Sequence, residues 1–494
     1  MTERNLAGLA AAVLQPGFVG ATPPEWVCRW LGEGLGAVVL FARNVVDPDQ
    51  LAALTATLRA ERPDVLVAID EEAGDVTRIE SARGSSRPGN FALGAVDDPA
   101  LTEEVARDLG VELASLGVTL NYAPDADVNN NPANPVIGVR AFGADPGLVA
   151  RHTAAWVRGL QSAGVAACAK HFPGHGDTRV DSHHDLPRIT ADRSRLDAGE
   201  LVPFRAAVAA GVQAVMTGHL LVPALDPDLP ATLSRRILGD LLRDELGFSG
   251  VVVTDAVEMR AVADRYGFAG AAVRALAAGA DAICVGGERA DEEAARQLRD
   301  AIVAAVVAGE LPEERLAEAA KRVGQLAAWT VAARAARPAG AAVAPDGSPV
   351  GLVAARRALR VSGDAAGVLP LTGAPHVVEF APPRNIAIGA ETPWGIAAPL
   401  TELLPGTTTV RLAEADLPAG PTAAAGRPVV LVVRDLHRHD WMRAAVARAL
   451  AERPDAVVVE LGVPELVTGR VHVATHGATR AGARAAAELL AGAA

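Results

Sequence analysis

The sequence predicts an α/β protein: a (β/α)8 TIM-like barrel followed by a smaller three-layer α/β sandwich domain. Over about the first 330 residues, eight short apolar or β-branched runs alternate with Ala/Leu/Arg-rich stretches. This alternation favours parallel strands joined by right-handed helical crossovers, and a closed barrel is the simplest arrangement of eight such units. Polar residues stand where several of the runs end, and a shorter strand–helix alternation follows an Ala/Pro/Gly-rich stretch.

The runs define the elements in order. The barrel strands are expected at residues 12–18, 36–42, 65–70, 117–124, 164–171, 213–220, 250–257 and 280–286, of which the first is the weakest. Strands of the second domain are expected at 376–382, 428–435 and 455–464, with a final helix over 478–492. These elements predict a barrel domain over residues 1–335, a linker over 336–350 and a small α/β domain over 351–494. The alternative for the last part is a helix-covered extension of the barrel.

Composition limits the class of partners. The formal net charge of -13 argues against binding to nucleic acid or to an anionic membrane, since both need a basic face. Cys28, Cys168 and Cys284 are too few and too widely spaced for a disulfide framework or a zinc ribbon. The N-terminal segment lacks the basic start of a signal peptide, and no apolar run is long enough to span a bilayer. We therefore expect a cytoplasmic protein, monomeric or homodimeric.

Five polar residues stand where apolar runs end: Asp70, Lys170, His171, His219 and Asp255. In a barrel they would gather at the carboxyl ends of the strands, where barrel enzymes carry their active sites. The alternative is that such residues only begin helices. Lys170 is one of two lysines among 46 basic residues, which indicates that a compact ammonium is needed there. Lys170 and His171 could donate hydrogen bonds to substrate hydroxyls, or form an ion pair and a buried imidazole contact.

The stretch "KHFPGHGDTRVDSHHDLP" begins at Lys170 and is rich in histidine. His171 and His175 have the spacing of zinc ligands on a helix. However, Pro173 and Gly174 lie between them and prevent a shared helical face, so no metal site is expected.

Within this stretch, Asp181 precedes His183 by two residues. A carboxylate that accepts a hydrogen bond from one ring nitrogen raises the imidazole pKa and leaves the other nitrogen for proton transfer. The alternative is a solvated polar loop. His184 and Asp185 form a second such pair, and the sequence does not rank the two.

Other segments supply a carboxylate and guanidinium groups. Three valines lead to Asp255, which with Glu258 also fits an acidic helix start. Arg78 follows Asp70 by eight residues, and Arg140 lies in an Asn/Pro-rich loop. Such pairs can bind vicinal sugar hydroxyls, although surface ion pairs explain them equally well. A carboxylate with a braced imidazole is sufficient for double displacement at an acetal carbon.

Four segments together resemble family 3 of the glycoside hydrolases, in the order that the family shows. They are "IDEEAGDVTRI", "NPANPVIGVRAFG", "AKHFPGHGDTRVDSHHDLP" and "PATLSRRILGDLLRDELGFSGVVVTDAVEM". The "DSH" form resembles the bacterial β-N-acetylglucosaminidase branch. The resemblance covers roughly residues 10–330, and the tail from 474 to 492 resembles the end of the smaller domain in two-domain members. It implies that Asp255 is the nucleophile and that His183 is the acid/base, with Asp181 as its partner. It also implies that five residues bind the sugar: Asp70, Arg78, Arg140, Lys170 and His171.

The resemblance implies a retaining exo-acting β-N-acetylglucosaminidase that removes terminal β-GlcNAc from small oligosaccharides, glycopeptides or peptidoglycan fragments without a cofactor. Phosphorolysis to GlcNAc-1-phosphate is the main alternative, because a neutral imidazole, unlike a carboxylate, does not repel phosphate. More distant alternatives are a β-glucosidase, a Schiff-base lyase using Lys170, and a non-catalytic sugar-binding protein. Ala73, Gly74 and Asp75 depart from the two glycines and arginine usual in the family, and the second domain is short.

Overall fold

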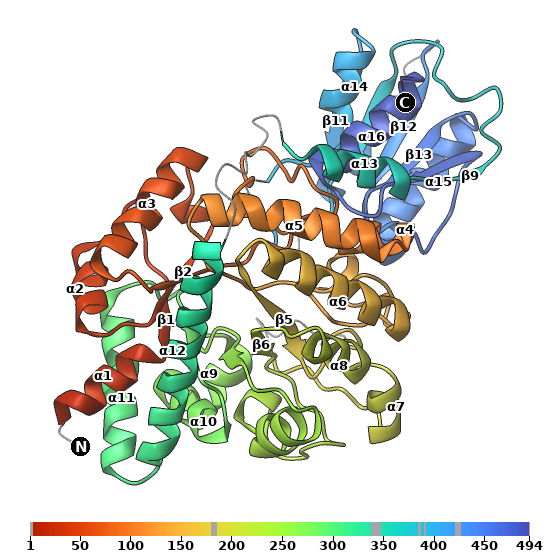
Figure 1. Cartoon of the computed structure of the whole chain (residues 1–494). Coiled ribbons are helices and arrows are strands. Elements are labelled where there is room, and N and C mark those ends of the chain that lie inside the picture. The colour runs from red at the N-terminus through yellow and green to blue at the C-terminus, as the bar shows by residue number, and fades with distance from the viewer. Residues whose placement is uncertain are drawn as a thin grey trace. The chain divides into compact units, whose positions relative to one another are not determined.

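The computed structural model describes residues 3–178, 185–336, 347–383, 387–389, 392–419 and 426–493. Within them the chain forms two compact units, and each is built from several segments (Figure 1). The first unit comprises the described residues of Met1–Glu72, Thr102–Ile137 and Ala144–Val343. The second comprises those of Ala73–Leu101, Gly138–Gly143 and Ala344–Ala494. Two loops that lie within the N-terminal part of the sequence therefore pack with the C-terminal part.

The strands of the first unit all run parallel. They are β1 (Leu14–Pro16), β2 (Ala37–Leu40), β3 (Leu66–Ile69), β4 (Leu120–Asn121), β5 (Ala166–Phe172), β6 (Ala214–Thr217), β7 (Val251–Thr254) and β8 (Ile283–Val285). Seven of the eight predicted segments contain one of them, and β5 extends one residue beyond the predicted 164–171. Strands β2 to β7 form one sheet in sequence order, and β1 pairs with β8. Single bridges from Gly17 to Val39 and from Val253 to Ala282 connect the two sheets, so the whole curls around a common core.

Helices separate these strands along the chain, as the alternation predicts. They are α1 (Glu3–Ala12), α2 (Glu25–Glu33), η1 (Ala42–Asn44), α3 (Pro48–Glu61), α5 (Pro99–Ser115), α6 (Pro146–Ser162), α7 (Arg193–Ala198), α8 (Leu201–Ala209), η3 (Ala231–Leu233), η4 (Arg236–Glu245), α9 (Arg260–Tyr266), α10 (Phe268–Ala278), α11 (Glu292–Val307) and α12 (Glu313–Ala336). Five of them begin after an aspartate that accepts a backbone N–H of the first turn, which stabilises a helix start. These aspartates are Asp47, Asp98, Asp145, Asp192 and Asp291.

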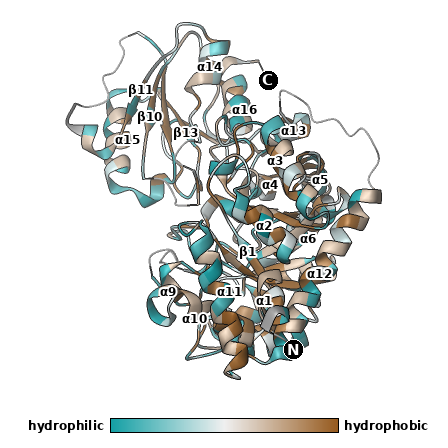
Figure 2. Cartoon of the chain, turned by 90° about the vertical axis from the view of Figure 1, so that its left-hand side faces the viewer, coloured by the Kyte–Doolittle hydropathy of each residue, from teal (hydrophilic) through white to brown (hydrophobic). Residues whose placement is uncertain are grey.

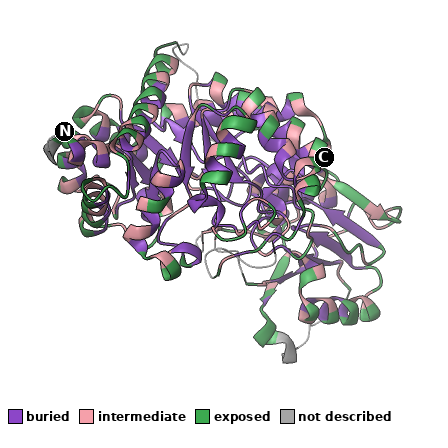
Figure 3. Cartoon of the chain, turned by 90° about the horizontal axis from the view of Figure 1, so that it is seen from below, coloured by how far each residue is buried: buried purple, intermediate pink, exposed green. Residues whose placement is uncertain are grey.

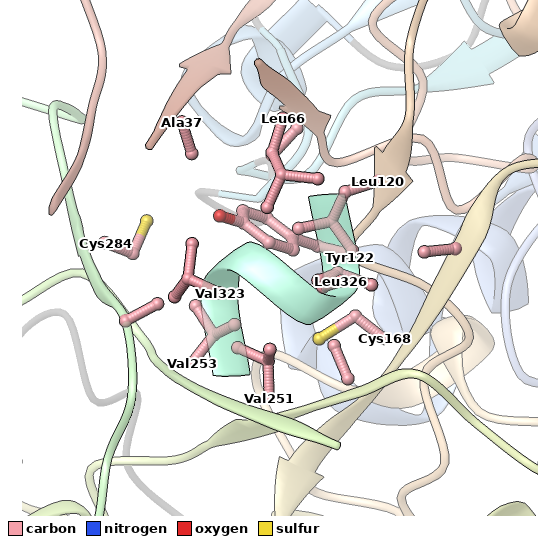
Figure 4. Close-up of a cluster of buried hydrophobic side chains, with 14 of the residues drawn as sticks. Ala37, Leu66, Leu120, Tyr122, Cys168, Val251, Val253, Cys284, Val323 and Leu326 are labelled. Atoms are coloured by element: carbon pink, nitrogen blue, oxygen red, sulfur yellow. The ribbon is translucent and has the colours of Figure 1, made fainter. Parts of the chain in front are cut away.

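The core inside the curled sheet consists of every second strand residue, because successive strand side chains point to opposite faces. Figure 4 shows this cluster, with Leu66, Leu120 and Val253 among the side chains from the strands, and Tyr122 directly after β4. Many of the others are alanine or cysteine, which suits the narrow interior. Val323 and Leu326 of α12 complete the cluster. The strand segments are buried, as the purple arrows of Figure 3 show.

The second unit contains a mixed sheet with the strand order β11-β10-β12-β13-β14-β9. Its strands are β9 (Arg360–Gly363), β10 (His376–Phe380), β11 (Thr408–Leu412), β12 (Val429–Val433), β13 (Val457–Glu460) and β14 (Val471–Ala474). Only β9 runs antiparallel to its neighbour. Strands β10, β12 and β13 and the final helix lie where the sequence predicts them; β9, β11 and β14 were not predicted.

Helices cover both faces of this sheet, whose strands carry hydrophobic residues (Figure 2). The helices of the unit are α4 (Asn90–Val96), η2 (Gly138–Arg140), α13 (Pro349–Ala358), α14 (Ala397–Leu403), η5 (Glu414–Ala419), η6 (Leu436–Arg438), α15 (Asp440–Glu452) and α16 (Arg480–Ala491). Val430 packs on the side of α14 and α16, whereas Leu431 packs on the side of α15. Among the described residues, no helix combines the length and apolarity needed to cross a bilayer.

Candidate active site

Polar side chains collect at the carboxyl ends of the first unit's strands. Asp70 follows β3, Lys170 and His171 lie in β5, and Asp255 follows β7. Because these strands are parallel neighbours in one curled sheet, their carboxyl ends lie on the same side of it. The order of the strands therefore places these residues at one end of the first unit.

Lys170 is a buried cation held between two carboxylates. Its Nζ lies 2.8 Å from Asp70 Oδ1 and 2.7 Å from Glu72 Oε1. The lysine side chain is 2% exposed, and a charge at that depth needs such partners to offset its lost hydration. Asp70 is the more exposed partner, at 22%. The pair therefore presents a carboxylate at the surface and keeps the ammonium directly beneath it.

His171 is oriented by Asp127, a fully buried carboxylate in the loop after β4. The ring Nδ1 lies 2.8 Å from Asp127 Oδ2, and a carboxylate can only accept, so Nδ1 carries the proton. Asp127 Oδ1 also accepts the backbone N–H groups of His171, at 3.2 Å, and of His175, at 2.6 Å. This aspartate fixes the ring and the backbone on both sides of the turn.

Asp255 is half-buried and stands directly after β7. Its backbone N–H donates to the Thr217 carbonyl, and its Oδ1 accepts the N–H of Ala256 at 2.8 Å. Cys284 lies in the core below the strand ends. Burial raises the pKa of its thiol well above the usual value, and the negative charges of Glu258, Asp70 and Asp255 raise it further. Strands β3 and β7, which Asp70 and Asp255 follow, both contribute residues to this core.

Glu258 holds the loop after β8 from one side. Its Oε1 accepts the backbone N–H groups of Gly286 and Gly287, each at 2.7 Å, and burial raises the pKa of this carboxyl. On the other side, the Arg43 guanidinium donates to the carbonyls of the same two glycines. The two side chains together fix the position of this loop beside the segment that carries Asp255.

His219 also stands at a strand end, but it is completely buried. Its Nε2 lies 3.0 Å from the carbonyl oxygen of Ala256, and its Nδ1 lies 2.9 Å from Thr232 Oγ1. The carbonyl can only accept, so Nε2 is a donor. The histidine thus holds the backbone next to Asp255.

One group among the described residues has the donor atoms for a metal ion: Asp125, Asp127 and His171, whose atoms lie within 4.8 Å of one another. Hydrogen bonding also accounts for this arrangement, because the imidazole donates to Asp127 and the Asp127 N–H donates to Asp125 at 3.0 Å. Sequence reasoning did not select Asp127, although it begins the Asn/Pro-rich loop, nor Glu72, although it lies two residues after Asp70.

Four other residues were predicted for the site. Asp181 and His183 fall outside the described residues. Arg78 and Arg140 belong to the second unit. There Arg78 donates to the Ala387 carbonyl at 3.1 Å, and the carbonyl of the buried Arg140 accepts from Asn90 at 2.8 Å.

Among the named proteins that this chain resembles are beta-hexosaminidases. Beta-hexosaminidase A of Pseudoalteromonas piscicida is 36% identical over 328 residues, which cover 62% of this chain and 55% of that protein. The match thus spans only about half the length of this relative. A beta-hexosaminidase of Alkalilimnicola ehrlichii is 40% identical over 255 residues, covering 50% of this chain and 73% of the relative.

Two solved structures extend this similarity to the fold. The glycoside hydrolase family 3 beta-N-acetylglucosaminidase from Paenibacillus sp. str. FPU-7 matches with a TM-score of 0.88 and 34% identity, over 99% of this chain and 97% of that one. The beta-N-acetylhexosaminidase from Beutenbergia cavernae matches with a TM-score of 0.60 and 32% identity, over 65% of this chain and 98% of that one. A family model described as the glycosyl hydrolase family 3 N terminal domain matches residues 24–326. Because that match covers more than half of the chain, this protein belongs to family 3 of the glycoside hydrolases.

Proposed function

We propose that this protein is a retaining exo-acting β-N-acetylglucosaminidase that removes terminal β-GlcNAc from small oligosaccharides or peptidoglycan fragments. The observation that carries the proposal is the strand-end cluster of Asp70, Lys170 and Asp255, in a chain whose relatives are beta-hexosaminidases. Such a cluster offers a nucleophile next to groups that bind sugar hydroxyls. The substrate class is taken from those relatives.

We propose a double displacement at the anomeric carbon. The Asp255 carboxylate forms a bond to C1 while the His183 imidazolium gives its proton to the glycosidic oxygen, which leaves as an alcohol. The neutral imidazole then takes a proton from water as the water oxygen attacks C1, and Asp255 leaves as a carboxylate. Asp181 would hold the imidazole in the required tautomer and support its charge.

The terminal sugar would be held by the polar residues around the nucleophile. A hydroxyl between Asp70 and Lys170 can donate to the carboxylate and accept from the ammonium at the same time. His171, oriented by Asp127, would contact the sugar through Nε2. By resemblance, Arg78 and Arg140 would bind the sugar as well.

The finer architecture belongs to the same proposal. We infer that the curled sheet of the first unit closes as a (β/α)8 barrel, which the bridges at Gly17 and Val253 support. We also infer that the second unit is a three-layer α/β sandwich, which the two apolar faces of its sheet support.

Two substitutions test the mechanism with the nitrophenyl glycoside of GlcNAc as substrate. Asp255→Ala should lower kcat/KM by at least about 10⁴-fold, because no covalent intermediate can form. His183→Ala should retain much of the kcat/KM of wild type on this substrate, because nitrophenolate leaves without a proton, and should lose about 10²-fold or more on a GlcNAc disaccharide. Near-normal turnover by the Asp255 variant would refute the nucleophile assignment.

Phosphate as the acceptor is tested in the same assay. A neutral imidazole base tolerates an incoming anion that a carboxylate base would repel. If phosphate neither accelerates nitrophenol release nor yields GlcNAc-1-phosphate, water is the acceptor.

A further inference from the structure

The chain that leads from β5 toward Asp181 and His183 is docked on the loop after β4. The centre of this contact is Asn134, which is 1% exposed. Its amide nitrogen donates to the carbonyls of His175 and Gly176, both at 2.9 Å, and lies 3.2 Å from Thr178 Oγ1. Asn134 is therefore the residue through which one loop holds the other.

The other end of the same amide organises its own loop. Asn134 Oδ1 accepts the backbone N–H groups of Val136 and Ile137, at 2.9 and 2.8 Å. An asparagine side chain that bonds the backbone two and three residues later fixes a turn. The amide nitrogen of Asn134 thus holds the other loop, and its amide oxygen fixes its own loop. Substitutions can remove one of these two contacts and keep the other.

Further contacts fix the docked segment from His175 to Thr178. The ring Nδ1 of the buried His175 lies 2.8 Å from Thr178 Oγ1, and Asn131 donates to the Thr178 carbonyl at 3.1 Å. Gly176 packs so closely that a Cβ there would lie 1.7 Å from the Val128 carbonyl oxygen. The backbone at Thr178 consequently has a defined position.

The docked segment is close in sequence to the proposed acid/base pair. Thr178 precedes Asp181 by three residues and His183 by five. A displacement of about 1 Å at a catalytic group can cost roughly 10²-fold in rate. We therefore expect a change in the docking at Asn134 to affect proton transfer.

We propose that Asn134 is a positioning residue for the acid/base pair of Asp181 and His183, acting through the hydrogen bonds that hold His175 to Thr178. The inference rests on the proposed function, since it assigns the proton transfer to His183. The buried His175 supports the same segment, because its N–H donates to Asp127 and its ring contacts Thr178.

The inference predicts a dependence on the leaving group. Protonation matters greatly when a sugar alcohol leaves and little when nitrophenolate leaves, because the latter is a weak base. A misplaced acid/base residue should therefore slow cleavage of a GlcNAc disaccharide far more than cleavage of nitrophenyl-GlcNAc. A general loss of folded enzyme would slow both by the same factor.

Three variants test this. Asn134→Asp keeps the acceptor for Val136 and Ile137 but removes the donors, and sets a carboxylate against two carbonyls. Asn134→Ala removes both ends. Thr178→Val removes the hydroxyl from the other side with little change of shape. Each should lower kcat/KM for the disaccharide by about 10-fold or more and for nitrophenyl-GlcNAc by less than about 3-fold. Thr178→Ser should restore the ratio of the two kcat/KM values.

Asn44→Ala is the matched control. Asn44 is equally buried, donates to the Phe18 and Gly20 carbonyls at 3.0 and 2.8 Å, and accepts the Phe41 N–H at 2.9 Å. This variant should lose stability and keep the wild-type ratio of kcat/KM values. Thermal unfolding checks that each variant is folded, and Thr178→Val carries the test if the Asn134 variants do not fold.

The outcomes separate the two proposals. Equal losses on both substrates, or no loss on either, in the folded Asn134 and Thr178 variants would overturn the positioning role. If His183→Ala itself shows no dependence on the leaving group, the acid/base assignment fails instead. If wild type does not cleave GlcNAc glycosides, the proposed function fails.

Discussion

Asp127 shows how much a single buried carboxylate contributes at the residue scale. It accepts three hydrogen bonds, from the His171 ring, the His171 backbone and the His175 backbone. A hydrogen bond to a charged group contributes about 1.5–3 kcal/mol, twice a neutral one. Asp127 thus stabilises the end of β5 and selects which nitrogen of His171 carries the proton.

We expect Asp127→Asn to lower kcat/KM for nitrophenyl-GlcNAc by roughly 10- to 100-fold, because an amide is a weaker acceptor and can present a donor to the ring instead. The loss should appear mainly in KM if His171 only holds the sugar. Asp226→Asn is the control, since Asp226 is also buried and accepts from Asp228, Leu229 and Ser234. Unchanged kinetics in the Asp127 variant would show that His171 needs no orientation.

The sequence predicted the strand-end residues but not the residues that hold them. Asp70, Lys170 and Asp255 follow apolar runs, so their place in the chain is visible without a structure. Asp127 and Glu72 become significant only through contacts with residues 44 and 98 positions away, for which the sequence carries no local signal.

At the scale of elements, the strands that the sequence predicted are mostly the buried ones. Strands β2, β3, β6, β7 and β8 of the first unit are mainly apolar runs, because parallel strands covered by helices are buried on both faces. Strands β9 and β11 lie at the edges of the second sheet and are largely exposed, so their sequences "RVSG" and "TTVRL" lack such a run. Strand β14 is buried but short, and a polar residue interrupts it.

The loop after β14 makes the second unit sensitive to acid. His476 in this loop is 5% exposed, and burial, together with the charge of Arg360, lowers the pKa of its imidazole to about 4. The folded state therefore binds fewer protons than the unfolded state, whose histidine has a pKa of about 6.5. Stability is fully present above about pH 6.5 and is lost as the pH falls toward 4.

We expect the Tm of wild type to fall between pH 6.5 and 4.5 by more than that of His476→Asn. Asparagine suits the position because the backbone φ of His476 is 61°, in the left-handed region that asparagine tolerates. The partly exposed His437 of the same unit offers a control, and His437→Asn should leave the acid sensitivity in place. Parallel Tm curves for wild type and His476→Asn would contradict the prediction.

At the scale of the whole molecule, the loop that carries Arg78 belongs to the second unit. Asp75 is buried and bonds to the Arg434 guanidinium at 2.6 Å and to the Ala478 N–H at 2.7 Å. Glu80 likewise bonds to Arg480 at 2.8 Å. The departure from the family pattern at Asp75 thus provides a partner for an arginine of the C-terminal part.

A chain that ends at Ala336 tests this dependence. In the present protein, truncation would remove the partners of Asp75 and Glu80, and breaking a buried ion pair costs about 3–5 kcal/mol. We expect residues 73–101 to lose their protection from hydrogen exchange in the truncated chain, while strands β2 to β7 keep theirs.

In the full chain, Arg434→Ala should reproduce part of this loss of protection. Arg470→Ala, which removes an exposed ion pair with Asp364, should not. Unchanged protection of 73–101 after truncation would mean that this loop is held by the first unit.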